Sequence, residues 1–383
     1  MKDYRRYIVS FFILLLFEGL GISLFNWFID PAGVTTSSTI EGVNNVKTAK
    51  EKQVRLFKTV AVAQIQPRAI VVGSSRTEFG IDPSHEIFNR SRPAYNLAIT
   101  GANMYEAKRY FDHALALNPE LEKAVIGIDF FMFNTLKKNA QDFREERLEK
   151  DYIIPTDWVN ILFSINNFQE SINTIKTSSE NPNEVGYFYA DGRRNADFYI
   201  KQIYQSASGK DLFRTVLRRN DFLSPNDSEK VYDLSDDFLQ AFSELIESCK
   251  INKIDCTVFI SPSHVTQWES IRVGGMWATF EEWKREVVEI TPVWDFSGYN
   301  SITSEPISRK MKNYFDSSHY RKEVGDLVLN RMFEVNIEEV PQGFGVWVTE
   351  DNIDRHLMEM RSQREQWAKD NPEWVKMVED LKK

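Results

Sequence analysis

The N-terminal run of apolar residues is the feature that most constrains how this chain can fold. Residues 7–29 form a 23-residue run whose only formal charge is Glu18, and three basic residues precede it. A helix of this length crosses a hydrocarbon core of about 30 Å. Because basic residues stay on the cytoplasmic side, we expect a retained signal-anchor over residues 1–30, with the chain after about residue 30 outside the cytoplasm.

A cleaved signal peptide and a helix buried in a protein core are the two other interpretations of this run. The run exceeds a normal signal-peptide core and no clear small-residue cleavage site follows it, which favours the anchor. A carboxyl group such as that of Glu18 costs about 2–3 kcal/mol near the bilayer centre. Two interpretations of Glu18 are open. Its side chain is protonated and tolerated in the helix, or it contacts a polar group of a partner membrane protein.

Composition excludes some classes of partner and bounds the size of the core. The chain has 383 residues, of which 42% are apolar, enough for one large domain with appendages. The net charge is −9 and no segment carries a sustained basic stripe, which argues against nucleic acid as the main partner. None of the five histidines shows metal-ligand spacing, so we expect no metal and no cofactor.

The two cysteines, Cys249 and Cys256, leave two interpretations open. In an exported chain they can form a disulfide between the end of one helix and the start of the next strand. Two free buried thiols are the alternative, because a spacing of seven residues does not by itself satisfy disulfide geometry.

After the anchor, short apolar segments alternate with amphipathic ones. The pattern predicts strands at 69–72, 94–98, 124–129, 256–260 and 293–296 and helices at 44–65, 104–117 and 234–248. Such alternation predicts a mostly parallel sheet covered by helices on both faces.

This pattern divides the chain into segments with different expected roles. We expect a linker and helix at 31–66, an α/β domain at 67–338 and a helical C-terminal tail of two helices at 339–383. The alternation is interrupted at 135–233 by a polar insertion that contains a helix-like piece at 158–172. We interpret the insertion as a lid or substrate-binding cap beside the sheet.

Three residues far apart in the chain predict a nucleophilic site. Ser75 follows the first predicted strand, in the turn Gly73-Ser74-Ser75-Arg76, and such turns gather at the carboxyl ends of parallel strands. Asp316 and His319 are three residues apart at the expected start of a helix, so both side chains can face one way. The carboxylate can then orient the imidazole toward a serine hydroxyl.

Three further residues are expected to bind an oxyanion or position the substrate: Gly101, Asn103 and Arg76. A glycine lets a backbone N–H approach a substrate oxygen closely, and the amide of Ser75 faces the same side. More ordinary roles stay open at this point. A serine or aspartate in these positions commonly caps a helix, and Arg76 can simply pair with a nearby carboxylate.

The order of these residues resembles the SGNH (GDSL-like) hydrolase superfamily. Gly73-Ser74-Ser75 matches its Gly-Asp-Ser block with Ser75 as nucleophile, Gly101 matches its second-block glycine, and Asp316-Ser317-Ser318-His319 matches its Asp-x-x-His block. The closer likeness is to membrane-anchored members, namely the D-alanyl transfer protein of teichoic-acid modification and the alginate O-acetylation proteins. The resemblance rests on short motifs within 69–130 and 255–330.

The resemblance implies a flavodoxin-like three-layer α/β/α sandwich and an outward-facing, single-pass protein of the bacterial inner (cytoplasmic) membrane. It also implies a serine O-acyltransferase or esterase that acts on a cell-surface polysaccharide by O-acetylation. Such proteins work beside a multi-pass membrane-bound O-acyltransferase, which would be the partner of this chain in the membrane.

One residue departs from the superfamily pattern. Its third block, Gly-x-Asn-Asp, falls on Gly127-Ile128-Asp129-Phe130, so Asp129 occupies the place of an oxyanion-binding asparagine. An ionised carboxylate donates no hydrogen bond and would repel a developing negative charge. This departure and Glu18 together support an alternative, a catalytically inactive scaffold in a polysaccharide-modification or export complex.

Overall fold

The structure is a computed structural model that describes residues 2–35, 37–203, 209–219, 222–223, 232–308 and 310–382. The chain forms two compact units. One consists of Met1–Gln64 and Arg144–Tyr189, and the other of Ile65–Phe143 and Ala190–Lys383. The segment expected to form a single insertion, 135–233, is therefore shared between the two units.

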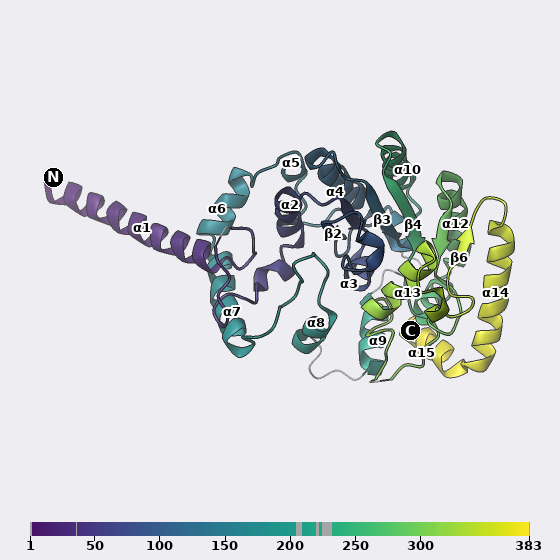
Figure 1. Cartoon of the computed structure of the whole chain (residues 1–383). Helices are drawn as coiled ribbons and strands as arrows, with labels where there is room; N and C mark the ends of the chain where they lie inside the picture. The colour runs from purple at the N-terminus through teal and green to yellow at the C-terminus, as the bar shows by residue number, and fades with distance from the viewer. Residues whose placement is uncertain are drawn as a thin grey trace. The chain divides into compact units, whose positions relative to one another are not determined.

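The second unit contains a six-stranded, mostly parallel sheet (Figure 1). The strand order is β2-β1-β3-β4-β5-β6, with β1 to β5 parallel and β6 antiparallel to β5. The strands are β1 Ala69–Val72, β2 Ala94–Asn96, β3 Lys123–Ile128, β4 Asp255–Ile260, β5 Val293–Asp295 and β6 Val346–Val348. The five predicted strands therefore form, with ends within two residues of those expected.

The helices of this unit follow their strands in the predicted alternation. Their bounds are α3 Ser75–Gly80, α4 Met104–Leu117, α8 Ala196–Ile203, α9 Gly209–Arg219, α10 Asp236–Ile251, α11 Val265–Val273, α12 Trp277–Ile290, α13 Lys322–Phe333, α14 Ile353–Asp370 and α15 Pro372–Lys382. Short 3₁₀ helices lie at Glu86–Phe88, Phe130–Phe133 and Ile337–Glu339.

Local sequence explains where the main helices begin. The side chain of Asn103 accepts a hydrogen bond from the backbone N–H of Glu106 and so caps α4. Ser235 caps α10 in the same way, and two aspartates in its first turn favour the positive end of the helix. The central strands β1 and β3 are almost wholly buried and rich in Val and Ile, and Val71, Val125 and Phe259 belong to one core cluster with residues of α13.

The helix-like piece at 158–172 and the C-terminal tail differ from the sequence-based expectation. The helix-like piece at 158–172 is two helices, because Ser164 ends one and its hydroxyl accepts from the N–H of Asn167 to start the other. The tail contains the two predicted helices, α14 and α15, and also β6, which the prediction missed. Three residues of β6 pair with β5, and a strand this short has too little alternation to be recognised.

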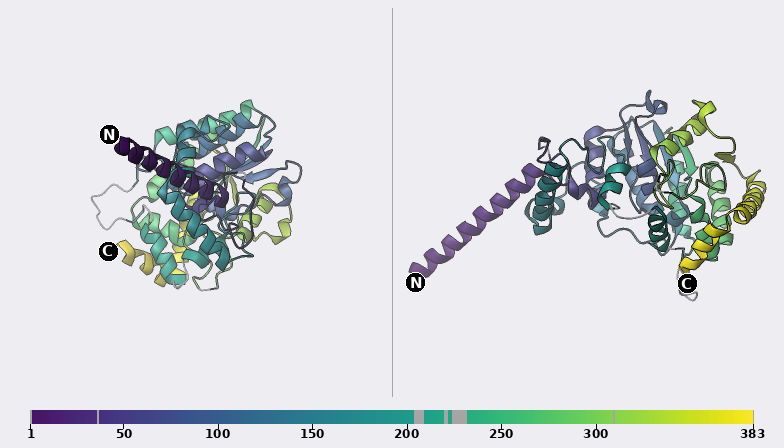
Figure 2. Two further views of the ribbon diagram at one scale, coloured as in Figure 1. Left: turned by 90° about the vertical axis from the view of Figure 1, so that its left-hand side faces the viewer. Right: turned by 90° about the horizontal axis from the view of Figure 1, so that it is seen from below.

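The first unit contains α1 Lys2–Ile29, the 3₁₀ helix Thr48–Glu51, α2 Val54–Ile65, α5 Glu145–Leu148, α6 Pro155–Phe163 and α7 Ile165–Glu180. The predicted helix at 44–65 is therefore shorter and begins at Val54. Within the described residues, Tyr4–Ile29 is long and apolar enough to cross a membrane, a property that N-terminal signal sequences share. Both views in Figure 2 show α1 as one continuous helix.

The two cysteines are joined by a disulfide between α10 and the strand that follows it. Cys249 lies in the last turns of α10 and Cys256 is the second residue of β4. Their Cα atoms are 6.2 Å apart, within the usual range for a disulfide. Of the two alternatives left open by the sequence, the structure contains the bonded one.

Candidate active site

The turn between β1 and α3 places Ser75 at the carboxyl end of β1. Ser74, and not Ser75, caps α3 by accepting the backbone N–H of Arg76 at 3.2 Å. Ser75 is the first residue of α3, so its own N–H has no acceptor within the helix. Gly73 has φ +153°, and a Cβ there would lie 2.6 Å from the carbonyl oxygen of Gly127, so only glycine fits this tight turn.

The side chains of Ser75, His319 and Asp316 form a hydrogen-bonded chain. Ser75 Oγ lies 2.9 Å from His319 Nε2, and His319 Nδ1 lies 2.7 Å from Asp316 Oδ2. An ionised carboxylate can only accept, so Nδ1 carries the proton of the neutral ring and Nε2 accepts from the serine hydroxyl. Asp316 is buried, whereas Ser75 and His319 are half-buried. This is the arrangement that activates a serine nucleophile.

A turn, and not the first turn of a helix, holds the Asp-His pair. The sequence places Asp316 at a helix start, but α13 begins only at Lys322. Asp316 Oδ1 accepts the backbone N–H groups of Ser318 at 2.7 Å and His319 at 2.8 Å, so the carboxylate organises its own loop. Asp316 thus combines the two roles that the sequence left open. Its Oδ1 accepts backbone N–H groups of its own loop, and its Oδ2 pairs with the imidazole of His319.

Close packing of α3 against α13 explains how residues 244 positions apart come together. A Cβ on Gly325 of α13 would lie 1.8 Å from the carbonyl oxygen of Gly80, at the end of α3. A Cβ on Gly80 would lie 1.8 Å from the ring of Tyr320, which is fully buried. The two glycines let the backbones and this ring touch, so the segment after His319 packs on the helix that begins at Ser75.

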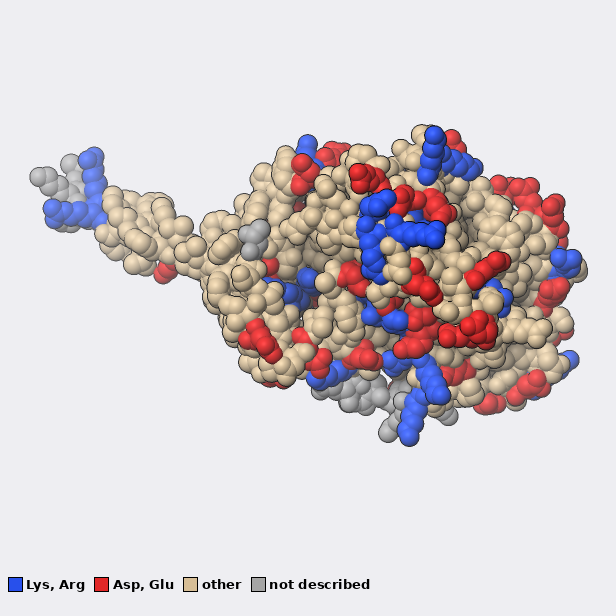
Figure 3. Space-filling view, viewed as in Figure 1, with Lys and Arg blue, Asp and Glu red and all other residues tan. Residues whose placement is uncertain are grey.

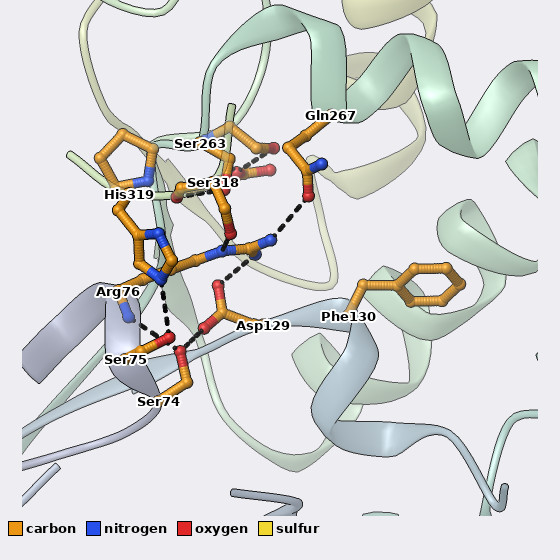
Figure 4. A network of polar contacts seen from close by, with 12 residues as sticks. Ser74, Ser75, Arg76, Asp129, Phe130, Ser263, Gln267, Ser318 and His319 are labelled. Atoms are coloured by element: carbon orange, nitrogen blue, oxygen red, sulfur yellow. Dashed lines mark hydrogen bonds and ion pairs between the residues drawn. The ribbon is translucent and has the colours of Figure 1, made fainter. Parts of the chain in front are cut away.

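Arg76 joins the ends of β1 and β3 to the histidine loop (Figure 4). Its Nη1 lies 2.7 Å from Asp129 Oδ1, its Nη2 donates to Gln267 Oε1 at 2.9 Å, and its Nε donates to Ser318 Oγ at 3.0 Å. The other carboxylate oxygen of Asp129 accepts from Ser74 Oγ at 2.5 Å. All five side chains are buried, so this network fixes the residues on either side of Ser75 and next to His319.

The network changes the interpretation of Asp129. Because both carboxylate oxygens are engaged and Arg76 compensates the charge, Asp129 is a structural ion-pair partner. The positive charge of Arg76 therefore offsets the repulsion that the carboxylate of Asp129 was expected to exert on a developing oxyanion. Of the roles that the sequence left open for Arg76, the structure contains the ion pair with a nearby carboxylate. Its guanidinium donates to three acceptors. Sequence reasoning missed the roles of Gln267, which lies in no motif, and of Ser318, which occupies a variable position of the Asp-x-x-His block.

Gly101 and Asn103 have different surroundings. Gly101 has φ +66°, and a Cβ there would meet no atom within 4 Å, so its α-carbon borders open space. Asn103 uses its oxygen to cap α4, and its amide nitrogen donates to Lys137 O at 3.0 Å and Asn139 Oδ1 at 2.8 Å. The expected role of Asn103 as an oxyanion donor is therefore corrected, because both of its N–H groups have acceptors.

A second buried network holds the turn that contains Gly101. Arg194 Nη1 donates to Thr100 Oγ1 at 2.5 Å and lies 3.2 Å from Glu78 Oε2, and the Thr100 hydroxyl also donates to Glu78. Glu78 belongs to the helix that starts at Ser75, so this contact ties Gly101 to the nucleophile turn. Arg194 lies 116 residues from Glu78, and the sequence offers no signal that pairs them.

Aromatic rings surround the imidazole of His319. The ring of Phe315 stacks on it at a centroid distance of 5.4 Å, and Phe79 meets it edge-on at 5.2 Å. Tyr199 of α8 in turn contacts Phe79 at 5.2 Å. One part of the predicted insertion therefore packs against the residues that orient the histidine, on the same unit as the sheet.

His264, which also follows a strand, has a structural role. Its Nε2 lies 2.8 Å from Glu305 O, and its Nδ1 accepts the backbone N–H of Thr266 and so caps α11. Burial lowers its pKa to about 4, so the ring is neutral around pH 7.

Comparisons with known proteins add no family assignment: no protein-family model matches the chain, and no curated protein matches it significantly. In the described part of the chain, no three or more His, Cys, Asp or Glu residues are placed to hold a metal ion.

Proposed function

We propose that the chain is a membrane-anchored, outward-facing serine O-acyltransferase or esterase of the SGNH type that acts on a cell-surface polysaccharide. The observation that carries the proposal is the hydrogen-bonded chain from Ser75 Oγ through His319 to Asp316. The strand order of β1 to β5, 2-1-3-4-5, is that of flavodoxin-like folds, and it supports the proposed three-layer arrangement.

The first half-reaction transfers an acyl group to the enzyme. Ser75 Oγ attacks the carbonyl carbon of an ester, and His319 Nε2 takes the hydroxyl proton. Asp316 stabilises the imidazolium that forms. The C–O bond of the donor ester then breaks, His319 returns its proton to the leaving alkoxide, and acyl-Ser75 and an alcohol result.

The second half-reaction decides between an esterase and a transferase. His319 removes a proton from water or from a sugar hydroxyl, and the resulting oxygen nucleophile attacks the carbonyl carbon of acyl-Ser75. The bond between that carbon and Ser75 Oγ then breaks, and His319 returns the proton to Ser75 Oγ. Water gives a carboxylic acid, whereas a sugar hydroxyl gives a new O-acyl ester. We assign oxyanion binding to the backbone N–H groups of Ser75 and Gly101, because one begins a helix and the other borders open space. Acetyl is the acyl group we propose.

The anchor is α1, with its N-terminus in the cytoplasm and the rest of the chain on the periplasmic or extracellular side of the inner membrane. Figure 3 shows uncharged side chains along most of the projecting part of α1, with basic residues at its N-terminal end. A multi-pass membrane-bound O-acyltransferase that passes acyl groups across the bilayer is the proposed partner.

A fluorophosphonate probe tests the chemistry, because it reacts with activated serine hydroxyls. The full chain in detergent micelles is expected to label once, and Ser75→Ala is expected to abolish labelling. Ser74→Ala removes the neighbouring hydroxyl, which caps α3 and bonds Asp129, and is expected to slow labelling without abolishing it. Absence of labelling in folded protein would support the inactive scaffold instead. Loss with Ser74→Ala alone would move the nucleophile to Ser74.

Acetylation of the unlabelled enzyme by p-nitrophenyl acetate distinguishes transfer from hydrolysis. Acyl-Ser75 formed from p-nitrophenyl acetate is expected to release acetate to water slowly and to acetylate an added polysaccharide faster. Equal rates of acetate release with and without polysaccharide would favour an esterase.

A further inference from the structure

The end of α1 is clamped within the first unit by α6 and α7. Asn26 is fully buried, its Nδ2 donates to Leu162 O at 2.9 Å, and its Oδ1 accepts from Ser171 Oγ at 2.8 Å. The rings of Phe25 and Phe168 lie 5.4 Å apart. With α1 as the proposed anchor, the bilayer ends before these buried turns, which places α6 beside the lipid headgroups.

Exposed apolar side chains lie beside this junction. Val159 and Phe163, one helical turn apart on α6, are 58% and 52% exposed, and Ile165 at the start of α7 is 82% exposed. Leu162 is hydrogen-bonded to Asn26, so these residues lie near the last turns of α1. Large exposed apolar residues next to a spanning helix are typical of a surface that dips into the membrane interface.

A cavity of about 350 Å³ lies in the same unit. Trp27 of α1, Leu56 and Val60 of α2 and Trp158 of α6 line it, so its walls are largely apolar. This volume falls within the range of ligand pockets, roughly 300–1,000 Å³. Trp27 belongs to the end of the spanning helix, where tryptophan is enriched at the lipid–water boundary. The cavity therefore lies beside the end of the proposed anchor.

The charged residues of the cavity have different partners. Arg147 is held by Asp157 through two hydrogen bonds of 2.7 and 2.8 Å, so its charge is compensated. The adjacent Lys150 and Asp151 also line the cavity, and neither forms an ion pair with a residue that the structure describes. These two neighbours in the chain give the cavity one positive and one negative group, which is complementary to a phosphate that carries an ammonium group.

We propose that this cavity binds one acyl chain of a membrane phospholipid with a phosphoethanolamine headgroup. The phosphate lies against Lys150, the primary ammonium group against Asp151, and the chain between α2 and Trp158. The inference rests on the membrane anchoring in the proposed function and not on the chemistry of Ser75. Such a lipid would hold the first unit at the membrane surface.

Native mass spectrometry of the full chain, released from nanodiscs with equal amounts of phosphatidylethanolamine and phosphatidylglycerol, tests the proposal. One retained phosphatidylethanolamine per chain is expected. Val60→Trp fills the cavity and is expected to abolish retention. Ala61→Trp is the matched control, because it adds the same ring to α2 at a position that does not line the cavity and is expected to keep the lipid.

Charge variants test recognition of the headgroup. Asp151→Asn is expected to lower the preference for phosphatidylethanolamine over phosphatidylglycerol by about 2- to 5-fold, the effect of a partly exposed ion pair. Equal retention by Val60→Trp and the unchanged protein would overturn the cavity as the binding site. An unchanged headgroup preference in Asp151→Asn would overturn the assigned headgroup.

Fluorophosphonate labelling of the same samples separates this proposal from the proposed function. Val60→Trp with normal labelling and no lipid supports the cavity and shows that the rest of the chain is folded. Lipid binding without labelling would leave the lipid site standing and remove the enzyme.

Discussion

Replacing Asp129 by Asn tests whether this carboxylate is a flaw in the oxyanion site or a structural partner of Arg76. The superfamily pattern has asparagine at this place, so motif matching alone predicts that Asp129→Asn improves catalysis. The structure predicts the opposite. The substitution removes the counter-ion of a buried guanidinium at 2.7 Å and disturbs the bond from Ser74 Oγ.

The expected loss of stability in Asp129→Asn follows from the burial of the Arg76–Asp129 ion pair. Both side chains are at most 4% exposed, so solvent does little to stabilise an unpaired Arg76. Two unit charges about 4 Å apart attract by about 4 kcal/mol at an effective dielectric constant of about 20. Removing one member of a buried pair typically costs about 3–5 kcal/mol, which agrees. With about 2–3 °C of Tm per kcal/mol, we expect a fall in Tm of roughly 6–15 °C.

The assay is thermal unfolding of the full chain in detergent micelles, followed by tryptophan fluorescence, together with fluorophosphonate labelling at a temperature where both proteins are folded. Labelling is expected to slow roughly 10- to 100-fold, because Arg76 also holds Ser318 beside His319. The double variant Arg76→Met/Asp129→Asn is expected to be less destabilised than the sum of the two single variants, since the pair is then removed as a unit.

Glu122→Gln is the matched control. Its partner Arg68 lies 2.8 Å away, but both side chains are 40% exposed, so the variant is expected to leave Tm nearly unchanged. An Asp129→Asn protein as stable as the unchanged one, or one that labels faster, would refute the reasoning.

Three further predictions concern stability. His264 has a folded pKa of about 4 against an ordinary value near 6.5, so the unfolded chain binds the proton first and stability falls by about 3 kcal/mol as pH drops from 6.5 to 4. Acid unfolding curves of His264→Asn should lack this slope, and an unchanged slope would contradict the assignment. Removing the disulfide with Cys249→Ser/Cys256→Ser should cost about 2.5 kcal/mol in denaturant unfolding, as expected for a short closed loop, and alkylation of the unreduced protein should show no free thiol. Gly325→Ala should lower stability by about 1–3 kcal/mol, because its methyl group meets the Gly80 carbonyl, and a crystal structure with α3 and α13 unmoved would count against that contact.

Local patterns were enough to predict most of the elements that position the site. Strands such as 69–72 are short apolar runs between turn residues, and the helix at 104–117 forms over the predicted range. The candidate nucleophile, base and acid also follow from local chemistry, since each belongs to a short motif in a turn after a strand or before a helix. The helix start at Asp316 was wrong because the carboxylate accepts its own loop's N–H groups, a detail that propensity does not contain.

Amino-acid sequence by itself determined the apolar α1, the alternation of strands and helices, and the identities of Ser75, Asp316 and His319, because each depends on residue type within a few positions. Only the tertiary structure decided which distant side chains share a buried space. Arg76 meets Asp129 and Gln267, Arg194 meets Glu78, and Asn103 turns away from the site, because packing brings together groups that must hydrogen-bond once water is excluded.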